Sequence, residues 1–244
     1  MNPIINIFKS PEILADAFAK TLLKWVKDSE DEYFHIALSG GKTPSLLFSL
    51  LAEKYGEVFP WDKIHIWWGD ERMVPPSDPE SNYGVVNTLL FSKIRLNPYQ
   101  IHRIKGECDA HEEALRYSTE IQSLVPIRNG WPTFSLILLG LGDDGHTASI
   151  FPGQQQLFES SEYTTVALHP NSGQLRITLT GKVLNSAKKV VFLVAGTSKS
   201  QIFNDIINGS KNASFYPASL IRPEGELHWF VDDACAMRST NQEG

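Results

Sequence analysis

Residues 136–152 read LILLGLGDDGHTASIFP. Their apolar start, Leu136 to Leu139, predicts a buried strand, and the glycines that follow predict a turn, with a short helix beginning near His146. Ligands of open α/β sheets bind beyond the carboxyl ends of the strands, where this segment carries Asp143, Asp144 and His146. The segment is therefore a candidate site, although the aspartates alone are also compatible with a helix cap and the histidine with an ordinary polar residue.

Strand-like segments alternate with amphipathic helical segments along the chain. Strands are predicted at residues 33–38, 63–68, 101–104, 136–139, 163–168, 175–180, 189–195 and 227–231. Helices are predicted at residues 11–26, 44–51, 81–90, 110–124, 200–207 and 217–220. This alternation is typical of the α/β class with a mostly parallel sheet and helices on both faces, and the absence of a linker-like segment predicts one domain, residues 1–244.

The composition favours an ordinary globular protein that acts on small molecules. The chain has 42% hydrophobic and 20% charged residues and a formal net charge of −6, which argues against a nucleic-acid partner. We find no signal-peptide pattern and no apolar run of membrane-spanning length, and the two cysteines are too few for a disulfide framework. We therefore expect a cytoplasmic protein without a membrane partner, in which any phosphate site is built locally from a few cations and N–H groups.

Two further loops carry polar residues at the ends of predicted strands. Residues 39–44, Ser-Gly-Gly-Lys-Thr-Pro, precede a helix, so their N–H groups can face an anion, and Pro44 suits the first helical turn. A tight turn with a solvated Lys42 is the alternative, and a nucleotide P-loop is excluded because Ile36 stands where that loop needs glycine. Residues 70–72, Asp-Glu-Arg, follow the strand 63–68; alone they suggest a salt-bridged surface turn, but their place beside the other loops favours a site.

The pattern Gly140-x-Gly142-x-x-Gly145 matches the fingerprint of dinucleotide-binding folds. We discount this match, because Asp143 and Asp144 would direct negative charge towards a pyrophosphate. The glycines are interpreted instead as letting the backbone approach a ligand closely.

These segments occur in the order typical of one enzyme family. The motifs are residues 39–44, Asp70-Glu71-Arg72 with Ser81-Asn82, residues 142–152, Arg176-Ile177-Thr178 and residues 196–199. Together they span most of the chain, which resembles the 6-phosphogluconolactonases. The resemblance implies a Rossmann-like three-layer α/β/α sandwich and the hydrolysis of 6-phospho-D-glucono-1,5-lactone in the oxidative pentose phosphate pathway.

The resemblance also implies roles for individual residues. His146 would be the general base that takes a proton from the attacking water, a task that suits an imidazole, which titrates near neutral pH. Asp144 would orient its ring or stabilise the imidazolium. Arg72 or nearby N–H groups would stabilise the oxyanion, and the choice between them stays open.

The remaining implied contacts hold the substrate. The residues expected to bind the 6-phosphate are Gly40, Gly41, Thr43, Arg176 and Lys199. Asp70 and Asn82 are expected to bind sugar hydroxyls, and the glycines of residues 140–145 to let the lactone ring come close. We expect no cofactor and no metal, since no His/Cys set has metal-ligand spacing, and a monomer that binds a small phosphosugar lactone.

Two other functions stay open at this point. The first is that of an amino-sugar phosphate isomerase or deaminase, but those enzymes carry an acidic residue where this chain has Phe151 and a tyrosine where it has Arg72. The second is that of a non-catalytic sugar-phosphate sensor, which usually carries a DNA-binding module. The chain has no segment suited to one.

Several side chains are also open to a structural interpretation. Arg176 can face away from the pocket and Lys199 can be solvated, whereas Asp143 and Glu71 are expected to be structural, with Glu71 paired to a neighbouring cation. At least one of the adjacent tryptophans 67 and 68 is expected to be core packing. The histidines outside the motif are expected to be ordinary polar residues: His35, His65, His102, His111, His169 and His228.

Overall fold

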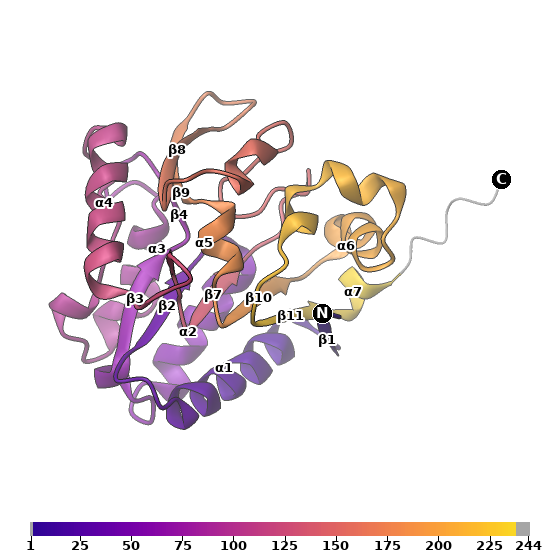
Figure 1. The fold of residues 1–244 in the computed structure, drawn as a ribbon. Helices are drawn as coiled ribbons and strands as arrows, with labels where there is room; N and C mark the ends of the chain where they lie inside the picture. Colours follow the sequence, from indigo (N-terminus) through magenta and orange to yellow (C-terminus); the bar gives the residue numbers. More distant parts are fainter. Residues whose placement is uncertain (1, 238–244) are drawn as a thin grey trace.

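The computed structural model describes residues 2–237, and a six-stranded sheet lies at its centre (Figure 1). All strand pairs in this sheet are parallel, which confirms the predicted fold class. In spatial order the strands are β1 (Ile4–Phe8), β11 (Glu226–Asp232), β10 (Lys189–Val194), β7 (Leu136–Leu139), β2 (Phe34–Leu38) and β3 (Ile64–Trp68).

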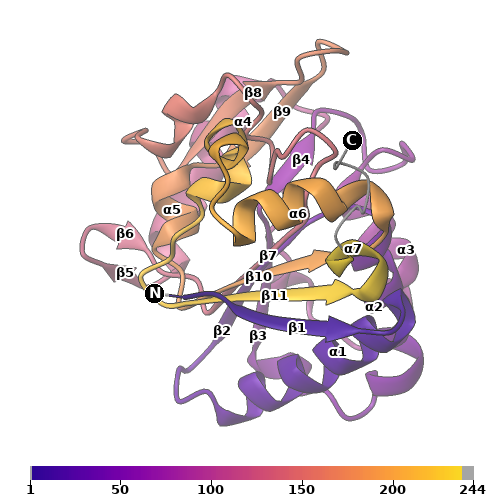
Figure 2. The same cartoon turned by 90° about the vertical axis from the view of Figure 1, so that its right-hand side faces the viewer.

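Helices cover both faces of this sheet, because successive strand side chains point to opposite sides. Figure 2 shows α1 (Pro11–Asp28) and α6 (Ser200–Ile207) on opposite faces. In β11, the ring of Trp229 lies against Phe203 of α6, and the ring of the next residue, Phe230, lies against Phe18 of α1. The three layers follow from this alternation.

The same alternation holds at the other edge of the sheet. In β3, Trp67 faces Tyr117 of α4 (Ala110–Leu124), and Trp68 faces Tyr83 of α3 (Asn82–Leu89). Both tryptophans are fully buried, which confirms the expectation of core packing.

The other helices are α2 (Lys42–Tyr55), which packs on α1, and the short α5 (Gly181–Asn185) and α7 (Asp233–Ala236). None of the helices within residues 2–237 has both the length and the apolar character that crossing a membrane requires.

A second sheet continues from the edge of the first. It contains β4 (Asp70–Arg72), β9 (Leu175–Leu179) and β8 (Thr164–Leu168), all antiparallel. Gly69 joins the two sheets, because its N–H donates to the carbonyl of Leu38 at 2.8 Å and its carbonyl accepts from the N–H of Leu179 at 2.8 Å. The prediction of a loop at residues 70–72 is therefore wrong. These three charged residues form a strand because they pair with β9, about a hundred residues further along the chain.

The helix predicted near His146 is also absent. After β7 the chain forms turns through Gly145, which has a φ of 81°, and Gly153, which has a φ of 86°, and it reaches only the 3₁₀ helix Gln155–Phe158. Residues 101–104 are not a strand either, since Ile101 makes only an isolated bridge to Ile66. The other predicted helices form, that at residues 217–220 as the 3₁₀ helix Pro217–Leu220. The short strands β5 (Ile127–Arg128) and β6 (Trp131–Pro132) form a separate ribbon.

Three of the histidines outside the motif form a buried cluster beneath α4. His65 and His102 share a hydrogen bond of 2.8 Å between Nδ1 and Nε2, and His35 Nδ1 accepts from the indole N–H of Trp67 at 3.1 Å. His102 Nδ1 lies 2.7 Å from Glu120 Oε1. Burial, together with the charges that His65 and His102 can carry, lowers the pKa of His35 to about 4.

This shift predicts that acid destabilises the fold through His35. The native state keeps the imidazole neutral, whereas the unfolded chain takes up a proton below pH 6.5. The His35 contribution is therefore complete above pH 6.5 and falls by about 3 kcal/mol as the pH approaches 4. Urea unfolding of the native protein and His35→Gln across this range measures it, because the glutamine oxygen still accepts from Trp67 but does not titrate. Identical pH slopes for the two proteins would contradict the prediction.

Candidate active site

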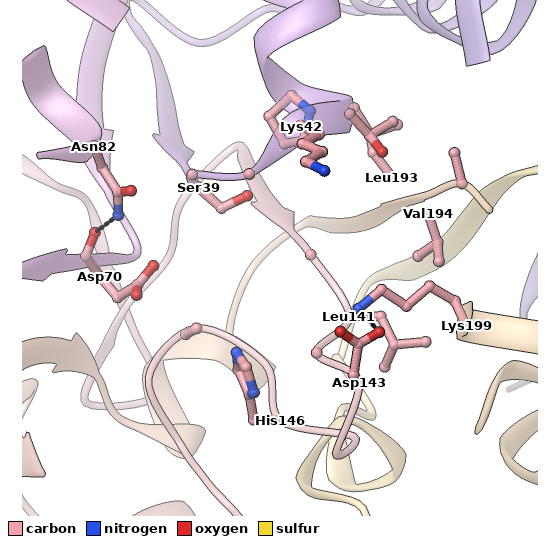
Figure 3. A pocket seen from close by; sticks show the side chains of 18 of the residues that line it. Ser39, Lys42, Asp70, Asn82, Leu141, Asp143, His146, Leu193, Val194 and Lys199 are labelled. Atoms are coloured by element: carbon pink, nitrogen blue, oxygen red, sulfur yellow. Dashed lines mark hydrogen bonds and ion pairs between the residues drawn. The ribbon is translucent and has the colours of Figure 1, made fainter. Parts of the chain in front are cut away.

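A cavity of about 510 Å³ opens at the carboxyl ends of β2, β7 and β10 and beside β4 and β9 (Figure 3). Every predicted site residue except Asp144 lines it: Gly40, Gly41, Thr43, Asp70, Arg72, Asn82, His146, Arg176 and Lys199. Among residues 2–237, no three His, Cys, Asp or Glu side chains come together as a group that could hold a metal ion.

His146 and Asp144 form a tightly coupled pair at the cavity. Asp144 Oδ1 lies 2.5 Å from Nδ1 of the imidazole and also accepts from the His146 backbone N–H at 3.0 Å. Burial opposes ionisation of Asp144, but these hydrogen bonds outweigh it and lower the pKa of the carboxyl to about 2. Because an ionised carboxylate only accepts, Nδ1 carries a proton, and in the neutral imidazole the free lone pair is then on Nε2.

The glycines around this pair make room for the protein's own side chains. A Cβ on Gly142 would lie 2.1 Å from His146 Nδ1 and 2.7 Å from Asp144 Oδ1. A Cβ on Gly145 would lie 2.4 Å from the ring of Tyr216. At these two positions glycine is required by the protein's own packing, because it lets the imidazole and a tyrosine lie against the loop. Gly142 also lines the cavity, and the close approach of a ligand there stays a prediction.

Alanine at position 142 is therefore expected to displace the imidazole. Gly142 lies outside the left-handed region, so the strain comes from the contacts with His146 and Asp144 and not from the backbone. We expect Gly142→Ala to fold but to lose about 10²-fold in kcat, the typical cost of a misplaced catalytic group. Gly69→Ala is the matched control, since its nearest contact would be an ordinary 3.5 Å. Steady-state turnover of phosphogluconolactone compares them, and an unchanged kcat in Gly142→Ala would refute the prediction.

The loop at residues 39–43 presents a helix N-terminus to the cavity. Gly41 is the N-cap of α2, with a φ of 114° that favours glycine, and in the described part of the chain no side chain caps the first turn. A Cβ on Gly40 would lie 1.9 Å from Asn82 Oδ1, so glycine allows the loop to sit against that amide. The hydroxyl of Ser39 is buried and has no hydrogen-bond partner within residues 2–237. Ser39 is a lining residue that sequence reasoning passed over, although it begins the motif.

Asp70 is held by Ser149 of the histidine loop and by Asn82, the first residue of α3. Its carboxylate accepts from the hydroxyl of Ser149 at 2.6 Å, and its carbonyl accepts from the side-chain amide of Asn82 at 2.9 Å. Ser149 in turn follows Ala148, which has a φ of 48° and lines the cavity. Sequence reasoning missed Ser149, which connects the histidine loop to Asp70; its place within the motif was the available signal.

Two guanidinium groups face the cavity from the second sheet. Arg72 and Arg176 are directly opposite one another across β4 and β9. Neither forms an ion pair with a carboxylate in residues 2–237; Arg72 donates to the carbonyl of Glu80, and Arg176 donates to Gln174 and stacks on Phe151. Burial and the charge of Arg72 lower the pKa of Arg176. The carboxylates of Asp70, Glu80 and Glu71 act on Arg176 only from beyond ion-pair distance. Like charges directly opposite in a strand pair are unfavourable, and an anion bound between them would offset the repulsion.

Glu71 points away from the cavity, as the strand period requires. Its carboxylate accepts from the backbone N–H groups of Arg72, Asn82 and Tyr83 at 2.7–2.9 Å and so caps α3. Burial raises the pKa of Glu71 to about 7, and these donors limit the rise. Its structural role is as expected, but the predicted cation partner is wrong.

The two lysines of the cavity differ in their surroundings. Lys42 is exposed, in keeping with the solvated alternative, although it lines the cavity. Lys199 forms an ion pair with Asp143, with 2.6 Å between Nζ and Oδ1. The loop that carries Lys199 is anchored where the carboxylate of Asp232 accepts from the N–H of Gly196 at 3.0 Å.

Comparison with known proteins identifies the family of this chain. The model of the family "Glucosamine-6-phosphate isomerases/6-phosphogluconolactonase" matches residues 9–229. The 6-phosphogluconolactonase of Haemophilus influenzae is 46% identical over 202 residues, which cover 82% of this chain and 85% of that protein. That of Aggregatibacter actinomycetemcomitans is 44% identical over 204 residues, 83% and 86% of the two chains. The structure of 6-phosphogluconolactonase from Trypanosoma cruzi has a TM-score of 0.88, with 29% identity and 98% of each chain covered. The chain therefore belongs to the glucosamine-6-phosphate isomerase/6-phosphogluconolactonase family.

Proposed function

We propose that this protein hydrolyses 6-phospho-D-glucono-1,5-lactone to 6-phospho-D-gluconate. The observation that carries the proposal is an imidazole held by Asp144 through Nδ1, in the same cavity as two guanidiniums that form no ion pair with a carboxylate of residues 2–237. The high identity to 6-phosphogluconolactonases over most of the chain supports the same activity.

In the proposed mechanism, His146 activates water. Nε2 takes a proton as the water oxygen attacks the lactone carbonyl carbon, and Asp144 stabilises the imidazolium that results. The carbonyl oxygen becomes an oxyanion, for which Arg72 is the cationic candidate. When the ring C–O bond breaks, the imidazolium returns its proton to the leaving hydroxyl, and the base is regenerated.

The phosphate group is proposed to bind where the cations and N–H groups meet. Gly40, Gly41 and Thr43 offer the start of α2, and Arg176 and Lys199 offer charge-assisted hydrogen bonds. Asp70 and Asn82 are then proposed to bind ring hydroxyls. Their carboxylate and amide suit hydroxyl groups, and their hydrogen bonds with neighbouring residues hold them in place.

The amino-sugar phosphate isomerase/deaminase function is less well supported. That chemistry moves protons between C1 and C2 and uses an acidic residue at the position of Phe151. Here Phe151 is fully buried and its ring centroid lies 4.7 Å from that of His146. An apolar ring beside the base cannot exchange protons, which favours the hydrolase.

A direct assay tests the proposal. Freshly prepared phosphogluconolactone is incubated with the protein, and acid release is followed against the spontaneous rate. Turnover far above that rate is expected, with no formation of ammonia from glucosamine 6-phosphate. A rate equal to spontaneous hydrolysis would refute the proposal.

We also propose that one copy of the chain, residues 1–244 as a single domain, is the active unit in the cytoplasm. Every group named in the mechanism comes from one chain, so no second copy is needed. Both cysteines, Cys108 and Cys235, are free thiols, which suits a reducing compartment. Sedimentation velocity at assay concentrations tests whether the protein is a monomer.

A further inference from the structure

The ion pair between Lys199 and Asp143 lies at the edge of the cavity (Figure 3). Lys199 follows β10 and Asp143 follows β7, so the pair connects two loops that both line the cavity. The side chain of Lys199 is 19% exposed and that of Asp143 is 74% exposed. Lys199 also lowers the pKa of the Asp143 carboxyl, so the carboxylate stays ionised at neutral pH.

This ion pair engages the ammonium group of Lys199, which the proposed phosphate site also uses. The Asp143 carboxylate accepts one of the three ammonium protons and offsets the positive charge of Lys199. Arg72 and Arg176, which belong to the second sheet, form no ion pair with a carboxylate within residues 2–237. Two cations, Arg176 and Lys199, are assigned to the phosphate. Among residues 2–237, only Lys199 of these two is paired with a carboxylate of the protein, which is an anion like the ligand.

The exposure of Asp143 makes this contact easy to exchange. A carboxylate that faces water keeps most of its hydration, so it gains little from the lysine and loses little when the lysine leaves. A phosphate carries more charge and more acceptor oxygens than a carboxylate, and the first turn of α2 and Arg176 reinforce its binding. Lys199 can thus pass from the aspartate to the phosphate and back.

We propose that Asp143 competes with the phosphate group for Lys199 and so weakens the binding of phosphorylated ligands. Asp143 is a positioning residue and not a catalytic one, because it acts only through Lys199. It holds the ammonium at the cavity when the site is empty and recaptures it as the phosphorylated product leaves. The inference rests on the proposed function for the identity of the ligand.

Calorimetry with defined ligands tests the competition. 6-Phosphogluconate, inorganic phosphate and gluconate are titrated into the native protein and Asp143→Asn at constant ionic strength. We expect Asp143→Asn to bind the two phosphate compounds about three- to tenfold more tightly and gluconate equally well. Asp62→Asn, an exposed aspartate that does not line the cavity, controls for the change in net charge and is expected to bind like the native protein.

A second background separates competition from a structural effect. In Lys199→Met, replacing Asp143 by asparagine is expected to change phosphate affinity less than twofold, because the contested ammonium is gone. Unchanged or weaker phosphate binding in Asp143→Asn, or equal tightening in the Lys199→Met background, would overturn the inference. Lactonase turnover is measured separately, so tighter binding without turnover rejects the proposed function alone, and turnover without tighter binding rejects this inference alone.

Discussion

Replacing His146 by asparagine is expected to lower kcat by roughly 10²- to 10⁴-fold, the usual contribution of a general base. The asparagine amide can still donate to Asp144, but it offers no basic nitrogen to the attacking water. The affinity for 6-phosphogluconate should change little, since the phosphate is assigned to other groups. Steady-state turnover of the lactone and calorimetry of the product measure the two effects.

His111→Asn is the matched control for this substitution. His111 is exposed on α4 and does not line the cavity, so this variant should retain native turnover. If His146→Asn keeps kcat within tenfold of the native value, water is activated by another group and the assignment of His146 fails.

Replacing Arg176 by methionine is expected to lower kcat/KM for the phosphorylated lactone by about 10²- to 10³-fold. Most of the effect should appear in KM, because the phosphate is held equally in the ground state and the transition state. Hydrolysis of unphosphorylated glucono-1,5-lactone should be nearly unaffected. Measuring both substrates therefore separates loss of the phosphate contact from damage to the base.

The same substitution should not destabilise the fold. Arg176 is directly opposite Arg72, and like charges opposed in a strand pair are unfavourable. Methionine keeps an apolar stem that can pack on Phe151 in place of the guanidinium. Urea unfolding should show equal or higher stability, with Arg128→Met, an exposed arginine outside the cavity, as control. An equal loss of activity on both lactones together with lower stability would contradict this role.

The core of the fold is predictable from the sequence because its strands are buried on both faces. Segments such as Leu136–Leu139 and Lys189–Val194 are nearly continuous apolar runs, and the helices between them begin at recognisable caps such as Ser10 and Ser81. The edge strand Ile4–Phe8 was not predicted, because its isoleucines are exposed and it pairs with β11, at the far end of the chain.

The residues of the site were predictable, but their immediate partners were not. The motif order brings His146, Arg176 and Lys199 to one cavity. Asp70–Arg72 pairs with β9, and this pairing turns Glu71 to the face opposite Arg72. The pairing depends on a long-range register, which the local sequence does not show. The same limit applies to Gly142, since the ring that occupies its missing Cβ position becomes known only once the loop is folded.

The junction at Gly69 has a consequence for the fluctuations of the protein. Residues 40–43 and Lys199 extend from the parallel sheet, whereas Arg72 and Arg176 belong to the antiparallel one. A ligand that contacts residues of both sheets stabilises the closed junction. If the ligand cannot bind when the junction is open, the free energy of opening rises by the full free energy of binding. Amide hydrogens of β4 and β9 that exchange through such openings will then exchange about a hundredfold more slowly at a ligand concentration of 100 times Kd. Hydrogen exchange would thus report substrate binding at backbone positions that never touch the substrate.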